Sequence, residues 1–475
     1  MMFQELDAIY ARYQQAEHIP GLVYGVVQDG KLAHVKGSGV AALGSQVPVG
    51  PETFFRIASM TKCVTTLAVL LLRDRGRLSL DAVVADLVPS FARLKLPTAD
   101  SRPITLHDLL THQAGFVTDD PWGDRLLPQP LGDFNAMLEA GMHFARAPRI
   151  DFEYANLGYT LLGRVVEAAS GEPYSGFVRR EILRPIGMVQ TSYEIDDLPA
   201  GALALGYRRH DDTWSPAEIE HDGAYGAMAG IVTNAVEYAR FVAFMIDAWP
   251  ARDAAESGPV ARATRRELAV LHSGPRAPTL RKHQGREIWS ASAYGYGLVN
   301  SVESELGRIL HHRGGLPGYG SHFLFSPETG VGIFSFANRT YAAMNEPNVD
   351  AAQALKDAGL WKAPPVPVSA QLAPAVEAVS RIYRAGRIAE AQSLLAINFL
   401  LDRPAAEWDR HLAKLAERLG ELRHIDAVPN HALSAKLTLT CARGVVQGQL
   451  ILTGEQSPRI QALTLEAAAG DGPPL

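Results

Sequence analysis

A serine and a lysine stand three positions apart in the segment FFRIASMTKCVTTLAVLLL. Residues at i and i+3 of a helix lie side by side, so this spacing predicts contact between Ser59 and Lys62. Burying an ammonium group costs free energy unless the group has a partner or a chemical use. A lysine next to a serine hydroxyl can activate it as a nucleophile, and a helix N-terminus favours the negative charge that develops there. A second interpretation stays open, in which Ser59 caps the helix and Lys62 lies on a solvated turn.

A tyrosine and an asparagine stand two positions apart, just before another apolar helix, in FEYANLGYTLLGRVVEAASG. In extended backbone, residues at i and i+2 point to the same side. The phenol of Tyr154 and the carboxamide of Asn156 would then face one site. The alternative is structural: the Tyr154 ring packs in the core and Asn156 caps the following helix.

A histidine, an arginine and two glycines follow one another in LHHRGGLPGYGSHFLFSP. Consecutive glycines let the backbone approach a ligand closely and expose its N–H groups. His312, Arg313, Gly314 and Gly315 therefore form a third candidate element on or beside a strand. Taken by itself, the segment also fits a turn that contains a histidine.

These elements lie in different parts of one α+β pattern. Residues 5–16 have helical periodicity, and two β-rich runs from residue 21 are joined by Asp29 and Gly30, a strong hairpin signal. The periodicity is helical over 59–75 and mostly helical from about 80 to 250, and strands return over 293–337. We expect the early and late strands to build one sheet, with a cleft between this sheet and the helical insertion.

The end of the chain predicts a separate module. The stretch KAPPVPVSAQLAP has four prolines in 13 residues and little pattern, which is typical of a linker. Three helical segments and then alternating runs follow it. The predicted organisation is therefore a domain over 1–362 (sheet part about 1–80 and 290–362, helical part about 80–290), a linker over 363–374 and an α+β module of unknown role over 375–475.

Composition and charge exclude several classes of protein. The 475 residues are 47% hydrophobic and carry a net charge of −6, which excludes disorder and favours neither nucleic acid nor an anionic membrane as partner. The two cysteines make no disulfide framework, and His107 and His112, five apart, do not share a helix face; we predict no metal and no cofactor. The N-terminus has acidic residues where an export signal needs a basic start, and the most apolar run, 64–72, has about half the length of a membrane span. We expect a cytoplasmic protein without a membrane span.

The three elements, SxxK, YxN and HxG in this order, resemble the serine β-lactamase and penicillin-binding-protein superfamily. The branch that the chain is similar to comprises class C β-lactamases, D-Ala-D-Ala carboxypeptidases, family VIII esterases and D-aminopeptidases. The likeness runs from about residue 19 to 359 and includes the phrases ITLHDLLTHQAGF, ILRPIGMVQTSY and GGLPGYGSHFLFSPETGVGIFSFAN. It implies an α+β fold with a β-lactamase-like antiparallel sheet flanked by helices and an all-helical insertion, beside the small C-terminal α+β module.

The resemblance also implies residue roles. Ser59 would be acylated, and Lys62 and Tyr154, the latter as a phenolate stabilised by neighbouring cations, would share the general-base work. Asn156 would position the substrate, and His312 would stand at the cation position of the third motif. The N–H groups of Ser59 and Gly315 would form the oxyanion hole.

Other positions receive weaker assignments from the same resemblance. Arg313 replaces a hydroxyl residue of class C β-lactamases, and it either holds a substrate carboxylate or is turned away from the cleft by strand alternation. Tyr225 is the favoured pocket-wall residue, with Trp122 and Tyr319 as further aromatic candidates. Cys63 points about 100° away from Lys62 on the helix, which predicts a buried apolar role rather than a thiol mechanism.

The predicted function is a metal-independent serine hydrolase that works through an acyl-serine on small esters or amides, first of all a family VIII-type carboxylesterase. HRG in place of Lys-Thr-Gly argues against efficient β-lactam hydrolysis. The alternatives are a D-stereospecific peptidase or aminopeptidase, a weak β-lactamase, an acyltransferase, or a penicillin-recognising sensor or scaffold. The expected partner is a small ester, amide or peptide substrate, and a homo-oligomer through the C-terminal module is a further hypothesis.

Overall fold

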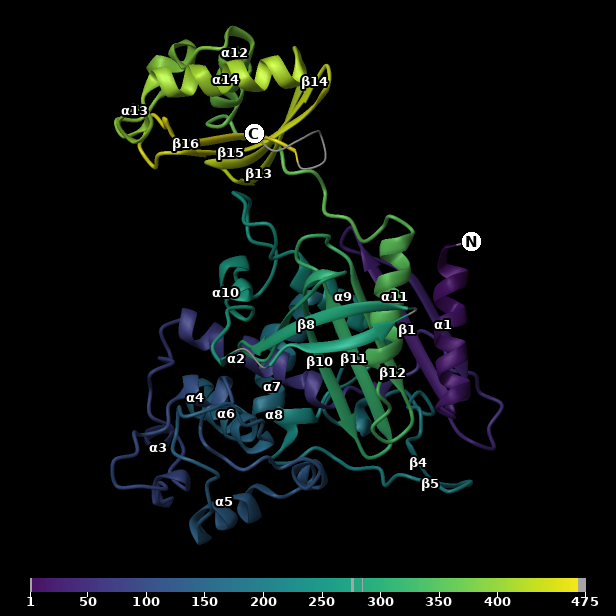
Figure 1. Ribbon diagram of the computed structural model, residues 1–475. Helices are drawn as coiled ribbons and strands as arrows, with labels where there is room; N and C mark the ends of the chain where they lie inside the picture. The colour runs from purple at the N-terminus through teal and green to yellow at the C-terminus, as the bar shows by residue number, and fades with distance from the viewer. Residues whose placement is uncertain (1, 275–276, 284, 469–475) are drawn as a thin grey trace. The chain divides into compact units, whose positions relative to one another are not determined.

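The computed structural model describes residues 2–274, 277–283 and 285–468 (Figure 1). The chain divides into two compact units, Met1–Ala363 and Pro364–Leu475. The second unit has an apolar core of its own, separate from the two cores of the first unit.

An eight-stranded antiparallel sheet is the framework of the first unit. Its strand order, β2-β1-β12-β11-β10-β9-β8-β7, brings the start of the chain beside its later part. β1 pairs with β12 in the register Leu22↔Ala337. The strands are β1 (Gly21–Gln28), β2 (Lys31–Gly39), β7 (Thr279–His283), β8 (Arg286–Tyr294), β9 (Val299–Glu303), β10 (Gly307–Leu316), β11 (Tyr319–Phe325) and β12 (Gly332–Ala337). The α+β class predicted from the order of strands and helices is confirmed.

The turn between β1 and β2 shows why the Asp-Gly signal is reliable. Asp29 and Gly30 both have positive φ, 52° and 71°, as a two-residue hairpin turn that matches the strand twist requires. Aspartate tolerates this left-handed conformation and glycine adopts it without strain. The hairpin therefore forms from local sequence alone.

The two faces of the sheet are covered by different layers. On one face, Phe323 and Phe334 belong to the large core that contains α2 (Thr61–Asp74) and α9 (Ala235–Ile246). On the other face, Leu324 and Ile333 pack in a smaller core with α1 (Met2–Ala16) and α11 (Asn345–Asp357) (Figure 1). Alternation along β11 and β12 sends neighbouring side chains to opposite layers.

A helical part is inserted between the early and late strands. Short strands interrupt it: β4 (Tyr207–His210) and β5 (Thr213–Pro216) form a hairpin, and β6 (Val232–Thr233) pairs with β3 (Phe55–Arg56), which precedes the insertion. The insertion is thus not all helical, in contrast to the all-helical insertion that the resemblance implies. The sequence does not predict these strands, because runs of two to four residues are too short for their periodicity to be recognised. Its other helices are α3 (Val84–Leu87), α4 (Leu106–Leu110), α5 (Leu131–Ala140), α6 (Asn156–Ser170), α7 (Tyr174–Val178), α8 (Gly226–Ala229) and α10 (Arg262–Glu267). Within the described ranges, no helix combines the length and apolar character needed to cross a membrane.

The second unit is a four-stranded antiparallel sheet with helices. The strand order is β13-β14-β15-β16, and Leu412 and Leu415 of α14 pack with Leu437 and Leu450 of the sheet. Its elements are α12 (Ala373–Ala385), α13 (Phe399–Asp402), α14 (Ala405–Leu419), β13 (Leu422–His431), β14 (Ser434–Cys441), β15 (Gly444–Leu452) and β16 (Ile460–Ala467). The sequence pattern predicts three of these strands and misses β13, an edge strand whose polar residues and Pro429 hide its alternation.

Candidate active site

Ser59 lies in a single 3₁₀ turn, Ala58–Met60, directly before α2. The preceding residue, Ala58, has φ 50°, an uncommon left-handed conformation for a residue with a Cβ. The turn is held from the sheet, because the Ser321 hydroxyl of β11 donates a hydrogen bond of 2.8 Å to the Ile57 carbonyl. Ser59 lines a cleft of about 1300 Å³, which is large compared with the sites of small ligands.

Lys62 lies in the first turn of α2 and is completely buried. Its Nζ donates to Ser59 Oγ at 2.9 Å, Asn156 Oδ1 at 2.7 Å and the Met228 carbonyl at 3.1 Å. Burial lowers the pKa of Lys62 to about 8, although nearby aspartates, Asp120 first, oppose the shift. Lys62 therefore loses its proton much more readily than an exposed lysine, and the resulting neutral amine is held against the serine hydroxyl.

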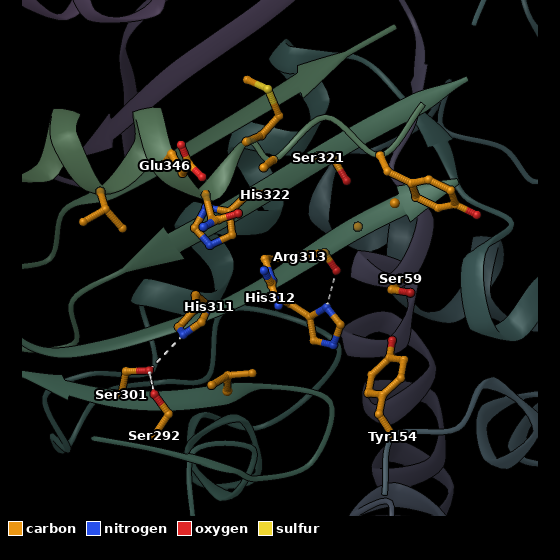
Figure 2. A pocket seen from close by; sticks show the side chains of 18 of the residues that line it. Ser59, Tyr154, Ser292, Ser301, His311, His312, Arg313, Ser321, His322 and Glu346 are labelled. Carbon is orange, nitrogen blue, oxygen red and sulfur yellow. Dashed lines mark hydrogen bonds between the residues drawn. The ribbon is translucent and has the colours of Figure 1, made fainter. Parts of the chain in front are cut away.

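Tyr154 lies beside this pair. Lys62 Nζ is 4.9 Å from the centroid of the Tyr154 ring, and the phenol hydroxyl points toward Ser59 (Figure 2). Burial, and then the charge of Asp120, raise the pKa of Tyr154 well above its ordinary value. The phenolate form that the resemblance implies is therefore disfavoured in the free protein, and the neutral phenol is a hydrogen-bond donor.

Asn156 is the first residue of α6. Its carboxamide accepts from Lys62 and donates to Asp120 Oδ1, so both ends have partners. The helix start is fixed by Asp119, whose carboxylate accepts from the backbone N–H groups of Asn156 at 2.6 Å and Leu157 at 2.9 Å. A carboxylate at a helix N-terminus is favoured by the helix dipole. Sequence reasoning did not find this aspartate.

Two further carboxylates of the same loop line the cleft with Ser59 and Tyr154, namely Asp120 and Asp124. Asp124 accepts a hydrogen bond of 2.9 Å from the Tyr341 hydroxyl. Burial, and then the charge of Asp120, raise the pKa of Asp124 to about 7. The only signal for them in the sequence is the density of aspartates in DDPWGD, around one proline and one glycine, for which solvated surface is the ordinary explanation.

His312 is buried on β10, and its ring lies 6.4 Å from that of Tyr154. Its Nδ1 is 2.6 Å from the Arg313 carbonyl and its Nε2 is 3.1 Å from the Tyr294 hydroxyl. Burial, and then the charge of Lys62, lower the pKa of His312 to about 3. His312 therefore occupies the third-motif position as a neutral imidazole rather than as a cation, donating from Nδ1 and accepting at Nε2.

The two glycines of the third motif bring β10 against the nucleophile. A Cβ on Gly314 would lie 2.2 Å from the Ile57 carbonyl oxygen, so only glycine permits this approach. Gly315 is next along the strand, beside the Tyr341 ring. The oxyanion hole of Ser59 and Gly315 stays a prediction.

Lys62 forms hydrogen bonds with Ser59 and Asn156 and lies over the Tyr154 ring, and His312, Arg313 and Gly315 line the same cleft as Ser59 and Tyr154. Other predicted residues lie elsewhere.

Tyr225 is fully buried against Phe134 and is not among the residues that line the cleft, because its ring packs into the core before α8. Tyr319 is buried and donates to the Ala204 carbonyl, while Trp122 is 52% exposed. Cys63 is buried with its Sγ 2.8 Å from the Gly297 carbonyl, and burial raises its thiol pKa, as an inert structural cysteine requires.

Comparison with known proteins agrees with this geometry. The family model described as Beta-lactamase matches residues 6–358. Protein flp of Staphylococcus aureus (strain COL) is 26% identical over 337 residues, which cover 70% of this chain and 63% of that protein. Penicillin-binding protein 4 of Amycolatopsis lactamdurans is 29% identical over 315 residues, 64% of this chain and 74% of that protein. The match thus spans slightly less than two thirds of the Staphylococcus relative.

Solved structures show the same fold. The octameric penicillin-binding protein homologue from Pyrococcus abyssi has a TM-score of 0.62 and 19% identity, covering 97% of this chain and all of that one. A class C beta-lactamase has a TM-score of 0.59 and 18% identity, covering 75% of this chain and 96% of that one.

Proposed function

The chain belongs to the β-lactamase family, and from this premise we propose that it is a serine hydrolase that cleaves small carboxylic esters through an acyl-Ser59 intermediate, as a family VIII-type carboxylesterase. The observation that carries the proposal is the 2.9 Å contact between Lys62 Nζ and Ser59 Oγ inside a large cleft. A buried amine with a pKa of about 8 is a general base near working pH.

The contacts support a definite order of proton transfers. In the neutral form, Lys62 donates its two protons to Asn156 Oδ1 and the Met228 carbonyl, which leaves the nitrogen lone pair for the proton of Ser59. Ser59 Oγ then bonds to the ester carbonyl carbon, and the carbonyl oxygen becomes an oxyanion that backbone N–H groups stabilise.

Collapse of that intermediate breaks the bond to the leaving alcohol. The alcohol oxygen takes a proton from the Tyr154 hydroxyl, which regains one from the Lys62 ammonium. In the second half-reaction, water gives a proton to neutral Lys62 and its oxygen bonds to the acyl carbon. The bond from that carbon to Ser59 Oγ then breaks, and Oγ regains a proton from Tyr154, which is reprotonated by Lys62. Tyr154 serves here as a neutral relay, in agreement with its raised pKa.

A second candidate is an aminopeptidase for D-configured substrates, favoured by Asp120 and Asp124. These carboxylates line the cleft beside Ser59, and their mutual repulsion contributes to the raised pKa of Asp124. A substrate ammonium next to them would relieve that repulsion. Esters of amino acids would then be better substrates than esters of simple acids.

A substrate panel tests both candidates on the full chain. It comprises p-nitrophenyl esters of increasing chain length, D- and L-aminoacyl anilides and a chromogenic cephalosporin, each also offered with an amine acceptor. Preference for simple esters supports the esterase, and preference for D-aminoacyl anilides supports the aminopeptidase. Turnover of the cephalosporin alone would indicate a β-lactamase, and aminolysis faster than hydrolysis an acyltransferase. An acyl-enzyme that forms and never turns over would indicate a sensor.

Replacing Gly314 with alanine is expected to lower kcat for p-nitrophenyl acetate by about 100-fold, because the new Cβ must push away the turn that holds Ser59. Gly132→Ala is the matched control, since a Cβ there meets nothing within 4 Å. Steady-state kinetics and thermal melting of both variants check the prediction. Equal kcat values in the two would contradict the role of this close approach.

Self-association through the second unit is part of the proposal, supported by the fold that this chain shares with the octameric Pyrococcus homologue over both units. Light scattering of the full chain, compared with a chain that ends at Ala363, tests it. The cytoplasmic location predicted from the N-terminal sequence stays a prediction, which fractionation of producing cells would test.

A further inference from the structure

A hydrogen bond joins two sides of the cleft that contains Ser59. The hydroxyl of Tyr341, a residue between β12 and α11, donates to Asp124 Oδ2 at 2.9 Å. Asp124 belongs to the insertion, 217 positions earlier in the chain. Both residues line the cleft together with Ser59. The bond therefore links the sheet part of the first unit to its insertion at one end of the cleft.

The carboxylate of Asp124 depends on this bond. Asp124 is only 2% exposed, and among the described residues the Tyr341 hydroxyl is its one hydrogen-bond donor, with no ion pair beside it. A buried acceptor that loses its partner costs free energy, and a charged acceptor costs more than a neutral one. Loss of the Tyr341 hydroxyl is therefore expected to turn Asp124 toward solvent.

Tyr341 is held in a strained backbone conformation. Its φ is 53°, in the left-handed region that residues with a Cβ rarely adopt. Its N–H donates to the Tyr319 carbonyl at 3.1 Å, and its ring lies against Gly315, where a Cβ would be 2.8 Å from ring atom Cδ1. Strained backbone persists where surrounding contacts hold it, and it is common at ligand clamps and switch regions. These contacts fix the Tyr341 ring beside Gly315.

The position along β10 identifies which end of the cleft this bond closes. Tyr154, which protonates the leaving group in the proposed mechanism, lies beside His312 (Figure 2). Gly315 is three residues further along the strand, about 10 Å away. A substrate that directs its leaving group from Ser59 to Tyr154 extends its acyl group toward the other end, beside Gly315. Tyr341 therefore stands at the acyl end of the cleft.

We propose that the bond between Tyr341 and Asp124 is a strap across the acyl end of the cleft, which makes the enzyme selective for esters of short acyl groups. A short acyl group reacts with the strap closed, whereas a long acyl chain must break the bond and displace the ring. The free energy of a hydrogen bond to a charged group is then lost with long acyl chains alone. The inference rests on the proposed acyl-Ser59 chemistry and adds the size of the acyl group to it.

Two esters with the same leaving group, p-nitrophenyl acetate and p-nitrophenyl octanoate, test the strap with the full chain. The pH is kept well above 7, the approximate pKa of Asp124, so that the carboxylate is ionised. The quantity compared is kcat/KM for the octanoate divided by kcat/KM for the acetate. Tyr341→Phe keeps the ring and removes the hydroxyl, so this ratio should rise about 30-fold over wild type, within the range for a hydrogen bond to a charged group. Asp124→Asn keeps an acceptor without the charge and should raise the ratio only about fivefold.

A double-mutant cycle shows whether the two side chains act through their common bond. Tyr341→Phe and Asp124→Ala should each raise the ratio, and the double variant should raise it no further than the larger single effect. Tyr13→Phe is the matched control, because the Tyr13 hydroxyl of α1 donates to the Ala343 carbonyl of the same loop at 3.1 Å and Tyr13 does not line the cleft. This variant should keep the ratio of wild type. Thermal melting of each variant checks that it is folded.

An unchanged ratio in Tyr341→Phe, an equal rise in Tyr13→Phe, or additive effects in the double variant would overturn the strap alone. If wild type hydrolysed neither ester, the proposed function itself would fail.

Discussion

Ser59→Ala is expected to lower the hydrolysis of p-nitrophenyl acetate by at least about 10⁴-fold, since loss of the nucleophile removes the covalent pathway. The substitution deletes one oxygen from a residue that is 7% exposed, so folding should be little affected. Steady-state kinetics measure the loss, and circular dichroism checks the fold.

Covalent labelling identifies the nucleophile independently of any substrate choice. A fluorophosphonate or a penicillin should add one adduct to the wild-type chain, located by mass spectrometry on the peptide that contains Ser59. Ser257→Ala, an exposed serine that donates to Asp247, is the matched control and should label like wild type. An adduct on another residue, or wild-type activity in Ser59→Ala, would refute the acyl-Ser59 mechanism.

Lys62→Met is expected to lower kcat/KM by about 10³-fold, within the range for loss of a positioned general base. The pH profile gives the sharper result. Because the pKa of Lys62 is lowered to about 8, the amine is protonated below that pH and cannot accept the serine proton. Wild-type kcat/KM should therefore rise about tenfold per pH unit below 8 and level off above it, and Lys62→Met should lose this rise.

Two control variants identify the group whose protonation causes the pH dependence of kcat/KM. Lys31→Met, an exposed lysine at the start of β2, should keep the rate and the profile of wild type. Asp124, whose pKa is raised to about 7, is the other group that could cause the pH dependence of kcat/KM. If the rise of kcat/KM with pH remained in Lys62→Met and shifted to another pH in Asp124→Asn, it would come from the aspartate. That outcome, or a rate in Lys62→Met within tenfold of wild type, would contradict the assignment of Lys62 as base.

The charge balance of the cleft follows from these contacts. A neutral His312, a lysine of lowered pKa and two aspartates leave the nucleophile side without a fixed cation for a substrate anion. In the described part of the cleft, the free positive charge is that of Arg313, on the opposite face of the sheet.

Local sequence determined those parts of the protein whose geometry depends on neighbouring residues. The contact of Ser59 with Lys62 follows from their i, i+3 spacing, because the 3₁₀ turn of Ser59 leads directly into α2. The β1–β2 turn follows from Asp29 and Gly30. The strand-helix-strand order was enough for the α+β class. The resemblance of the three motifs identified the superfamily, which the family match confirms.

Protonation states were decided by tertiary structure alone. Three groups expected to be charged or ionisable, Lys62, Tyr154 and His312, have pKa values shifted toward their neutral forms, mainly because burial disfavours charge. Burial depends on packing between chain segments more than 90 residues apart, as the Lys62–Asn156 bond shows. The spacing of residues in the sequence does not show which side chains are buried.

The same holds for residues that meet only through sheet register. Arg313 and His322 stand opposite each other because β10 and β11 pair in one register, and a shift of one residue would send one of them to the other face. The motifs carry the chemistry in their residue types, whereas the register and the burial decide which of those residues share a face and which of them carry a charge.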